Sequence, residues 1–193
     1  MAQPLFVQPP YLYVVFAAGL VLFVREVIVQ RRPVPGTDHD RGSFRVLWSV
    51  TGLTTTAAVL VPFVPIAPIG ATRIAFWVGI ACLLVGAGIR LWAIRTLEAF
   101  FTNQIAIHPE HEVVDAGLYA VVRHPAYTGA CLTYVGIGLA FGSWVSLALT
   151  AAGAGIGYGY RITVEESVLR AELGEAYAEY CERTPYRLVP GVW

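Results

Sequence analysis

The sequence predicts an all-α integral membrane protein with about five transmembrane helices, built as one domain over residues 1–193. Two observations support this fold class. First, 56% of the 193 residues are hydrophobic and only 13% are charged, with a mean hydropathy of +0.62, which is the balance of a chain that lies in lipid. Second, the hydrophobic residues fall into five long runs separated by polar or proline-containing segments, and a helix needs roughly 20 apolar residues to cross a bilayer.

The first two runs are the predicted first and second transmembrane helices. Tyr11–Val29 is interrupted only near its end, by Arg25 and Glu26, where a long arginine side chain can reach the interface. Because these charges follow the apolar run instead of preceding it, we expect a retained helix and not a cleaved signal peptide. A polar linker, Gln30–Arg45, leads to the second run, Val46–Val64, which ends in a proline-rich turn on the opposite face.

The other three runs complete the predicted bundle. Ile74–Ile94 contains three glycines that allow close helix packing. Arg90 and Arg95 at its end are interpreted as headgroup anchors, with a role in a cofactor site as the alternative. The fourth and fifth runs, Ala126–Phe141 and Trp144–Tyr160, are joined by only two residues, which predicts an antiparallel helical hairpin. The three glycines are Gly79, Gly86 and Gly88.

The distribution of charge predicts the orientation of the bundle. With five spans, twelve of the thirteen basic residues, all arginine, fall on the side of the first linker, the third connection and the C-terminal tail. Only Arg73 falls on the other side. The positive-inside rule then places the N-terminus outside and the other three segments in the cytoplasm. All thirteen carboxylates also fall on the cytoplasmic side, so we expect any chemistry to occur there.

Composition also narrows the classes of function. The formal net charge is zero and no basic block is interleaved with aromatic residues, so nucleic acid is not an expected partner. The three cysteines lie far apart without metal-ligand spacing. The sequence therefore predicts neither a disulfide framework nor a metal site.

A polar stretch between the third and fourth runs, HEVVDAGLYAVVRHPAY at residues 111–127, is the strongest candidate for a binding site. Gly117 and Pro125 restrict what the backbone can do, so a shaped loop is expected. Its charged and aromatic side chains lie beside apolar helices, as a pocket for a small polar cofactor requires. The alternative is a loop that only contacts lipid headgroups.

The tail supplies a second polar cluster where the fifth run ends. In RITVEE, Arg161 and Glu165 are four residues apart and would face the same way on a helix just beneath the bilayer surface. The alternative is a simple surface ion pair, worth only a few tenths of a kcal/mol. An apolar stripe then predicts an amphipathic helix that lies on the membrane or on the loop and ends at Pro185. The stripe consists of Leu169, Leu173, Tyr177 and Tyr180.

The chain from Leu97 to the C-terminus resembles the isoprenylcysteine carboxyl methyltransferase (ICMT) family of polytopic membrane enzymes. The resemblance is carried by LEAFFTNQIAIHPEHEVVDAGLYAVVRHPAYTG, RITVEESVLRAELGEAYAEY and the final RLVP. An H-x5-G-x-Y-x3-RHP-x-Y run, a short hairpin and an R-x3-EE exit occur in that order, whereas RHP-x-Y-x-G alone is shared with related phospholipid methyltransferases. The resemblance implies that residues 97–193 form the catalytic part, and that residues 1–96 are helices that match only in being apolar.

The resemblance further implies a cofactor, an acceptor and a set of site residues. The cofactor would be S-adenosylmethionine, and the acceptor would be the carboxylate of an isoprenylated cysteine or a similar lipidic carboxylate. Arg161 would be the catalytic and substrate-binding residue. Val113 and Ala126 replace the family's usual leucine and serine. The implied cofactor contacts are Gln104, His111, Glu112, Val113, Val114, Tyr119, His124, Pro125, Ala126, Tyr127 and Glu165.

Elementary chemistry is compatible with these assignments and leaves two alternatives. A carboxylate is ionised near neutral pH, since an α-carboxyl has a pKa of about 3.5, so the site must supply alignment and exclusion of water and needs no base. Tyr119 or Tyr127 could place a ring against the sulfonium, and His124 could donate to the cofactor or only hold the loop. One alternative is a phospholipid or other lipid N- or O-methyltransferase, with Glu166 as the base for an amine. The other is a non-enzymatic protein that binds headgroups or a partner.

Overall fold

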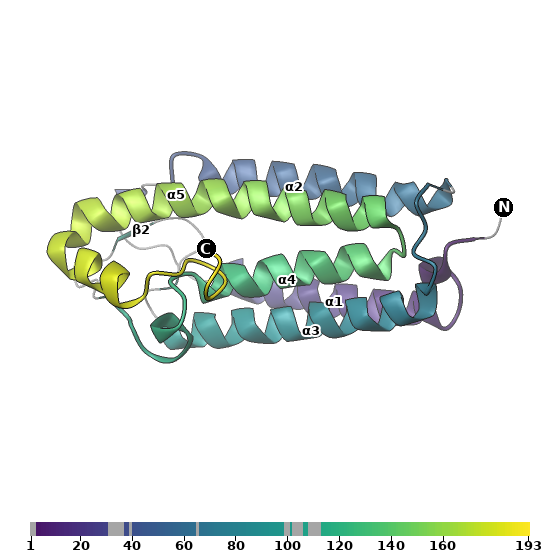
Figure 1. Cartoon of the computed structure of the whole chain (residues 1–193), viewed down its shortest axis with the longest axis horizontal. Helices are drawn as coiled ribbons and strands as arrows, with labels where there is room; N and C mark the ends of the chain where they lie inside the picture. The colour runs from purple at the N-terminus through teal and green to yellow at the C-terminus, as the bar shows by residue number, and fades with distance from the viewer. Residues whose placement is uncertain are drawn as a thin grey trace.

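The computed structural model describes residues 3–30, 37–38, 40–64, 66–98, 101, 106–107 and 113–193, and it confirms an all-α architecture (Figure 1). Within these residues, five α-helices lie side by side and short 3-10 turns and two-residue strands connect them. In chain order the elements are η1 (Leu5–Val7), α1 (Tyr11–Gln30), β1 (Thr37–Asp38), α2 (Ser43–Leu60), η2 (Val61–Phe63), α3 (Thr72–Leu97), β2 (Ala106–Ile107), η4 (Gly117–Ala120), α4 (Pro125–Ala140) and α5 (Trp144–Arg183).

Each apolar run of the sequence lies in one of these helices. In the part of the chain that the structure describes, three segments are long and apolar enough to cross a membrane, namely α1, α2 together with η2, and α3. α4 is shorter, at 16 residues, and the apolar first part of α5 continues without interruption into a polar second part. α2 gives way to η2 next to Pro62, because proline has no N–H to continue the helical hydrogen bonds.

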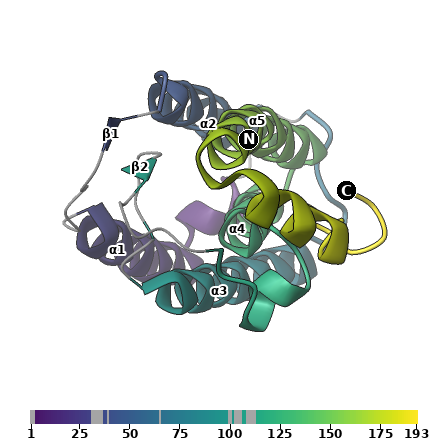
Figure 2. The ribbon, with the colours of Figure 1, turned by 90° about the vertical axis from the view of Figure 1, so that its left-hand side faces the viewer.

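The helices pack as two pairs, which are seen end-on in Figure 2. α2 lies against α5, α3 lies against α4, and α4 also packs on α5 at the centre of the bundle. α1 lies beside α3, and its Tyr13, Phe16, Leu20 and Phe23 are 62–69% exposed. An apolar helix with so many large side chains facing outward is expected to contact lipid or another apolar surface.

Glycines bring α3 and α4 into close contact, as the spacing of the third run predicts. A Cβ on Gly79 would lie 2.6 Å from the Gly136 carbonyl oxygen, and a Cβ on Gly86 would lie 2.5 Å from that of Gly129. The two backbones therefore approach as closely as they do only because these positions carry no side chain. Gly88 differs from the prediction, since no atom lies within 4 Å of its Cβ position.

The predicted hairpin between the fourth and fifth runs is confirmed. Gly142 adopts a φ of +75° at the turn, and the Ser143 Oγ accepts a hydrogen bond from the Val145 N–H at 3.3 Å at the start of α5. The Ser143 hydroxyl also donates to the Ile66 carbonyl at 3.2 Å. The hairpin therefore lies against the proline-rich turn at one end of the bundle.

α5 extends well past the apolar run and then bends back. The helix is broken at Gly174, whose φ is +53°, and its last part turns toward the start of α4 (Figure 1). Tyr177 and Tyr180 are buried, and the Tyr180 hydroxyl donates to the Tyr119 carbonyl at 2.8 Å. The predicted amphipathic stripe thus lies on the loop before α4. The helix ends at Arg183, two residues before Pro185.

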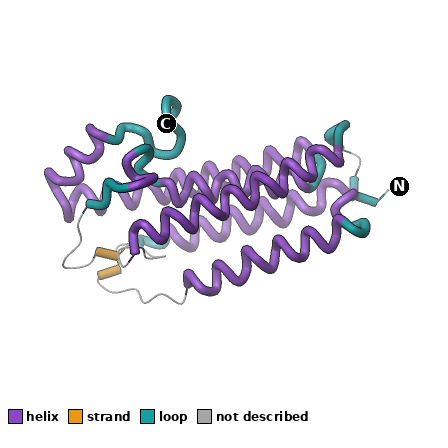
Figure 3. The backbone as a smooth tube through the Cα atoms, turned by 90° about the horizontal axis from the view of Figure 1, so that it is seen from below, coloured by secondary structure: helices purple, strands orange, loops and turns teal. Residues whose placement is uncertain are grey.

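The polar segments gather at the end of the bundle opposite the hairpin. There the linker after α1 and the connection after α3 meet as the antiparallel strands β1 and β2, with Thr37 paired to Ile107 and Asp38 to Ala106 (Figure 3). The chain begins at the other end (Figure 1).

Candidate active site

Arg161 lies on α5 just beyond the apolar part of that helix and is only 3% exposed. Its Nη1 donates to Asp40 Oδ1 at 2.7 Å and to Ser43 Oγ at 3.0 Å, and its guanidinium lies 5.7 Å from the centre of the Phe44 ring. Burial disfavours the charge, but nearby Tyr127 and Glu165 and the Asp40 hydrogen bond raise the pKa of Arg161 above its ordinary value. Arg161 is therefore a buried, permanently charged group.

Asp40 is the counter-ion of Arg161 and also holds the start of α2. Its Oδ1 accepts from the Ser43 hydroxyl at 2.9 Å, and its Oδ2 accepts from the Phe44 N–H at 3.0 Å. Burial alone would raise the pKa of Asp40, but the Phe44 N–H and the Arg161 and Ser43 donors lower it below its usual value. Asp40 thus joins the first linker to α5 as a carboxylate.

The Tyr127 hydroxyl connects Arg161 with Glu165. It accepts from Arg161 Nε at 2.9 Å and donates to Glu165 Oε2 at 2.6 Å. Its ring stacks on the His124 ring, with centroids 5.6 Å apart and planes 12° apart. Two segments predicted to form the site, the RHP-x-Y motif and the R-x3-EE exit, therefore meet directly.

Glu166 lies next to this network but has a different set of partners. Its Oε1 accepts from Arg123 Nε at 3.0 Å and from Arg187 Nε at 3.0 Å, and lies 3.3 Å from His124 Nε2. Its Oε2 accepts from Arg187 Nη2 at 2.9 Å. Burial would raise the pKa of Glu166, but the His124 and Arg187 hydrogen bonds and the positive charges around it lower it well below its usual range. Glu166 is a structural anion at the centre of three segments.

The C-terminal tail is tied to the RHP motif through the backbone. Arg123 Nη1 donates to the carbonyls of Thr184 and Pro185, each at 2.9 Å. The His124 N–H donates to the Arg187 carbonyl, also at 2.9 Å. These contacts hold the loop before α4 in the shape that presents Tyr127 to α5.

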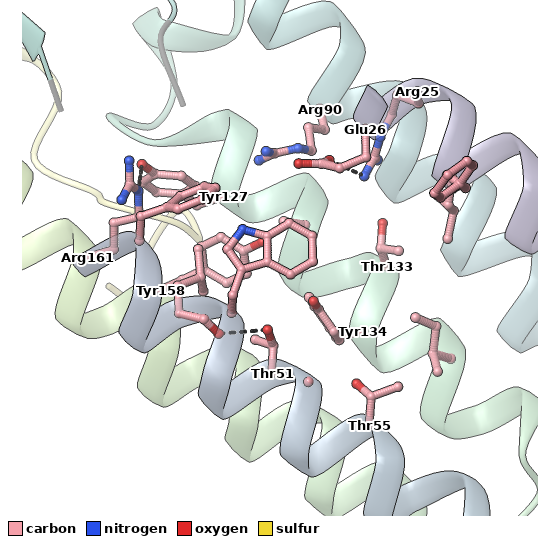
Figure 4. A pocket seen from close by; sticks show the side chains of 18 of the residues that line it. Arg25, Glu26, Thr51, Thr55, Arg90, Tyr127, Thr133, Tyr134, Tyr158 and Arg161 are labelled. Carbon is pink, nitrogen blue, oxygen red and sulfur yellow. Dashed lines mark hydrogen bonds and ion pairs between the residues drawn. The ribbon is translucent and has the colours of Figure 1, made fainter. Parts of the chain in front are cut away.

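A cavity of about 560 Å³ lies beside Arg161 (Figure 4). α1, α2, α4 and α5 supply most of its lining residues, with Arg90 from α3, and most of its wall is apolar or aromatic. Arg161, Tyr127, Arg90, Arg25 and Glu26 line its polar part. Its larger apolar and aromatic lining residues include Phe23, Phe44, Leu47, Trp48, Tyr134 and Tyr158. A volume of this size, mostly apolar with a few charged groups, suits an amphiphilic molecule.

The structure brings some of the predicted site residues together and places others apart. Tyr127, Glu165 and Arg161 form one network, while His124 lies beside it and contacts Glu166 and Tyr127. Tyr119 is buried in an apolar cluster with Val29, Ile94 and Phe101, so of the two tyrosines only Tyr127 lines the cavity. Pro125 and Ala126 are buried at the start of α4, and Val113 and Val114 are half-buried. Gln104, His111 and Glu112 lie outside the described residues.

Several residues in this region were not predicted from the sequence. Asp40 and Ser43 come from the first linker, 121 and 118 residues from Arg161, and no motif connects those positions. Arg90 was left open and proves to be buried against the cavity, donating to the Ala126 carbonyl at 3.4 Å, whereas Arg95 is exposed. The sequence does contain an indication that Arg90 has a role. A charged side chain four residues inside an apolar run is energetically unfavourable in a membrane, and such residues are usually functional.

Comparison with known proteins places about half of the chain beside a known family. The model of the "Isoprenylcysteine carboxyl methyltransferase (ICMT) family" matches residues 77–171. Residues 77–171 belong to this family. The ICMT segment thus runs from α3 through the apolar part of α5 and includes Arg90, the RHP motif, Arg161, Glu165 and Glu166.

Proteins similar to this chain are found in plants. The "Probable protein-S-isoprenylcysteine O-methyltransferase" of Oryza sativa subsp. japonica is 31% identical over 109 residues, which cover 55% of this chain and 57% of the rice protein. "Protein-S-isoprenylcysteine O-methyltransferase A" of Arabidopsis thaliana is 35% identical over 112 residues, covering 55% and 57% of the two chains. The chain therefore spans little more than half the length of these curated relatives.

A solved structure shows a similar fold. It is described as the "eukaryotic intramembrane Ras methyltransferase ICMT", and it superposes with a TM-score of 0.61 at 22% identity, covering 75% of this chain and 52% of that one. The superposed part, 75% of this chain, is larger than residues 77–171. The similarity of fold therefore extends beyond the ICMT segment.

Proposed function

We propose that this protein transfers a methyl group from S-adenosylmethionine to the C-terminal carboxylate of an isoprenylated cysteine, or to a similar lipidic carboxylate, at the membrane. One observation carries the proposal. The Tyr127 hydroxyl lies within hydrogen-bond distance of both Arg161 and Glu165, and so joins the residue implied for the acceptor to a residue implied for the cofactor. This junction lies on the wall of an apolar cavity.

The residues around Tyr127 fit the chemistry of the cofactor. Glu165 is a half-buried carboxylate beside a neutral hydroxyl, which suits an ammonium or ribose hydroxyls. Tyr127 offers an aromatic face that suits a sulfonium. S-Adenosylmethionine, when bound, would supply an activated methyl group to this site. The predicted contacts at Gln104, His111 and Glu112 belong to the same proposal.

The cavity and Arg161 fit the acceptor. An isoprenyl chain would lie against the apolar wall, and a guanidinium binds a carboxylate well because the two groups have matching geometry. Arg161 Nη1 is engaged by Asp40, so an incoming carboxylate would share Arg161 with Asp40 or replace it. The buried surroundings exclude water from the nucleophilic oxygen, which strengthens each of these electrostatic contacts.

The same contacts argue against the amine acceptor. An amine must lose a proton, and Glu166 was the candidate base. Its four hydrogen-bond contacts to Arg123, His124 and Arg187 and its lowered pKa make it a weak base at neutral pH. A carboxylate acceptor needs no such group.

The site is proposed to face the cytoplasm, with the N-terminus outside and membrane lipid around the bundle. By position in the sequence, twelve of the thirteen arginines fall on the side of the first linker, the third connection and the tail, and Arg73 falls on the other side. The positive-inside rule supports this orientation.

Two variants test the assignment of roles. In purified protein, Arg161→Ala should reduce transfer of labelled methyl to a prenylcysteine analogue by about 100-fold or more, since a buried charged contact is worth roughly 2–5 kcal/mol. It should leave S-adenosylhomocysteine binding, measured by calorimetry, within about three-fold of wild type. Glu165→Gln should mainly weaken S-adenosylhomocysteine binding. Arg170→Ala, at an exposed cation on the same helix, is the control.

The product identifies the acceptor chemistry. Labelled methyl on a carboxylate is released by base as an ester, whereas methyl on nitrogen is stable. A panel of prenylcysteine analogues and phosphatidylethanolamine should give only base-labile product. Transfer to nitrogen would refute the carboxylate proposal, and lack of thermal stabilisation by S-adenosylhomocysteine would refute the enzyme.

A further inference from the structure

A second arginine in the cavity is incompletely satisfied. Arg25 lies on α1, lines the cavity and has a side chain only 14% exposed. Its Nη2 lies 3.4 Å from Glu26 Oε2. Its Nε and Nη1 are buried and have no hydrogen-bond partner among the residues that the structure describes. Burying guanidinium N–H groups without hydrogen-bond acceptors is energetically unfavourable. The Arg25 side chain can therefore donate to an acceptor that a ligand brings.

The charges around Arg25 are unbalanced in the positive direction. Among the residues that the structure describes, Arg25, Arg90 and Arg161 all line the cavity, and Glu26 is the one carboxylate that does so. Arg161 is paired with Asp40, whereas Glu26 is left beside both Arg25 and Arg90 (Figure 4). The part of the cavity across from Arg161 therefore carries excess positive charge in apolar surroundings.

We propose that Arg25, with Arg90 beside it, forms an anion-binding subsite separate from Arg161. It takes the acidic group, a carboxylate or a phosphate, of an amphiphile whose hydrocarbon chain lies along the apolar wall of the cavity. An anion there would accept from Arg25 Nε or from Arg25 Nη1, which lie on different edges of the guanidinium, and would neutralise the excess charge. The amphiphile can be a free fatty acid or a lipid of the surrounding leaflet, since both carry this chemistry.

This inference does not depend on methyl transfer. Arg25 lies outside the ICMT segment at residues 77–171, and the subsite is defined by binding alone. Loss of transfer in Arg161→Ala would therefore say nothing about Arg25, and loss of anion binding in an Arg25 variant would leave the proposed reaction standing.

Trp48 allows binding to be measured in the whole 193-residue chain, because it lines the cavity and is 44% exposed. The protein in phosphatidylcholine nanodiscs is titrated with dibromostearate, at a pH at which it is ionised, and with dibromostearyl alcohol, and quenching of tryptophan fluorescence is followed. We expect the carboxylate to bind about ten-fold more tightly than the alcohol. The chain has five tryptophans, so Trp48→Phe should remove the part of the quenching that differs between the carboxylate and the alcohol, which places the carboxylate ligand in the cavity.

Matched variants separate Arg25 from the other cations. Arg25→Gln should reduce the preference for the carboxylate to about two-fold or less. Arg25→Lys keeps the charge and should retain part of the preference, and it tests the proposal if Arg25→Gln does not fold. Glu26→Gln should preserve or increase the preference, because it removes the competing carboxylate. Arg95→Gln, at an exposed arginine that does not line the cavity, should leave the preference unchanged.

Two results would overturn the proposal. One is a carboxylate preference that survives Arg25→Gln in protein with unchanged far-ultraviolet circular dichroism. The other is a preference that Arg95→Gln abolishes, since this would indicate attraction to the surface charge in general. Unbrominated phosphatidylglycerol in the disc distinguishes the source, because it competes with dibromostearate only if headgroups of the leaflet reach Arg25.

Discussion

At the scale of single residues, the charge of Arg161 is held by partners from distant parts of the chain. Asp40 lies in the linker after α1 and Tyr127 lies in the first turn of α4, yet both are hydrogen-bonded to Arg161. The proposed acceptor must therefore bind a guanidinium that already has a protein carboxylate. Asp40 positions Arg161, and Asp40 also competes with any other carboxylate for the Arg161 guanidinium.

The competition can be tested with Asp40→Asn. The ion pair is buried, with side chains 4% and 7% exposed, so removing one charge should lower the free energy of unfolding by about 3–5 kcal/mol. At the same time, the KM for a carboxylate acceptor should fall, because Arg161 is no longer neutralised. Thermal unfolding and steady-state kinetics measure the two effects.

The control for this variant is Asp115→Asn. Asp115 pairs with Arg183 at 3.1 Å, and both side chains are more than half exposed, so its loss should change stability by about 1 kcal/mol or less. An Asp40→Asn protein whose KM rises would show that Asp40 helps to bind the acceptor and does not compete with it.

At the scale of elements, the contact between α3 and α4 sets the geometry on which the site depends. Gly86 and Gly129 let the two backbones meet, and Arg90 and Ala126 lie one turn or less from this contact, joined by a 3.4 Å hydrogen bond. A change in the distance between α3 and α4 would therefore shift Arg90 in the cavity wall and also weaken the packing of the two helices.

We expect Gly129→Ala to be far more damaging than Gly88→Ala. A Cβ at Gly129 would lie 2.5 Å from the Gly86 carbonyl oxygen and 2.7 Å from the Arg90 N, and relieving such overlap costs about 1–3 kcal/mol. Gly88 has open space around its Cβ, so alanine there should be neutral or stabilising by up to about 1 kcal/mol through helix propensity. Equal melting temperatures for the two variants would contradict this account of the contact.

The helices could be predicted from the sequence because their causes are local. The apolar runs, Pro62, Pro125 and the Gly142 turn each act on the neighbouring backbone, and the helix bounds follow within a few residues. Gly88 shows the limit, since the pattern cannot tell which of three glycines faces another helix. The bend at Gly174 was also missed, because a single glycine in a polar helix is compatible with either a straight or a broken path.

At the scale of the whole molecule, the site is an assembly of three segments that meet only in the folded chain. The motifs of the ICMT segment predicted that Tyr127, Arg161 and Glu165 would meet. Asp40 could not be predicted, since its pairing with Arg161 spans 121 residues and depends on where α2 begins. Tyr119 also shows the limit of a motif, because its place in the pattern does not reveal that the side chain is buried in an apolar cluster.

Glu166 holds this assembly together, since it binds the RHP motif and the C-terminal tail at once. Its contacts favour the carboxylate, so its pKa is lower in the folded chain than in the unfolded one. A group with a lowered folded pKa stabilises the protein fully above the unfolded value, near 4.5, and this stabilisation is lost as the pH falls toward the folded value. Asp40, whose pKa is also lowered, contributes in the same direction.

We therefore expect stability to fall steeply on acidification below about pH 4.5, and Glu166→Gln to reduce that dependence. The variant should be less stable than wild type at pH 7, because Arg123 and Arg187 lose their anion, and the difference should shrink as the pH approaches 3. Each kcal/mol corresponds to about 2–4 °C for a chain of this size, so melting temperatures in detergent at pH 7, 5 and 3 resolve it. A constant difference between the two proteins across this range would show that Glu166 is not the group whose protonation loosens the site. Glu172→Gln, at an exposed position on the same helix, serves as the control for removing a carboxylate from α5.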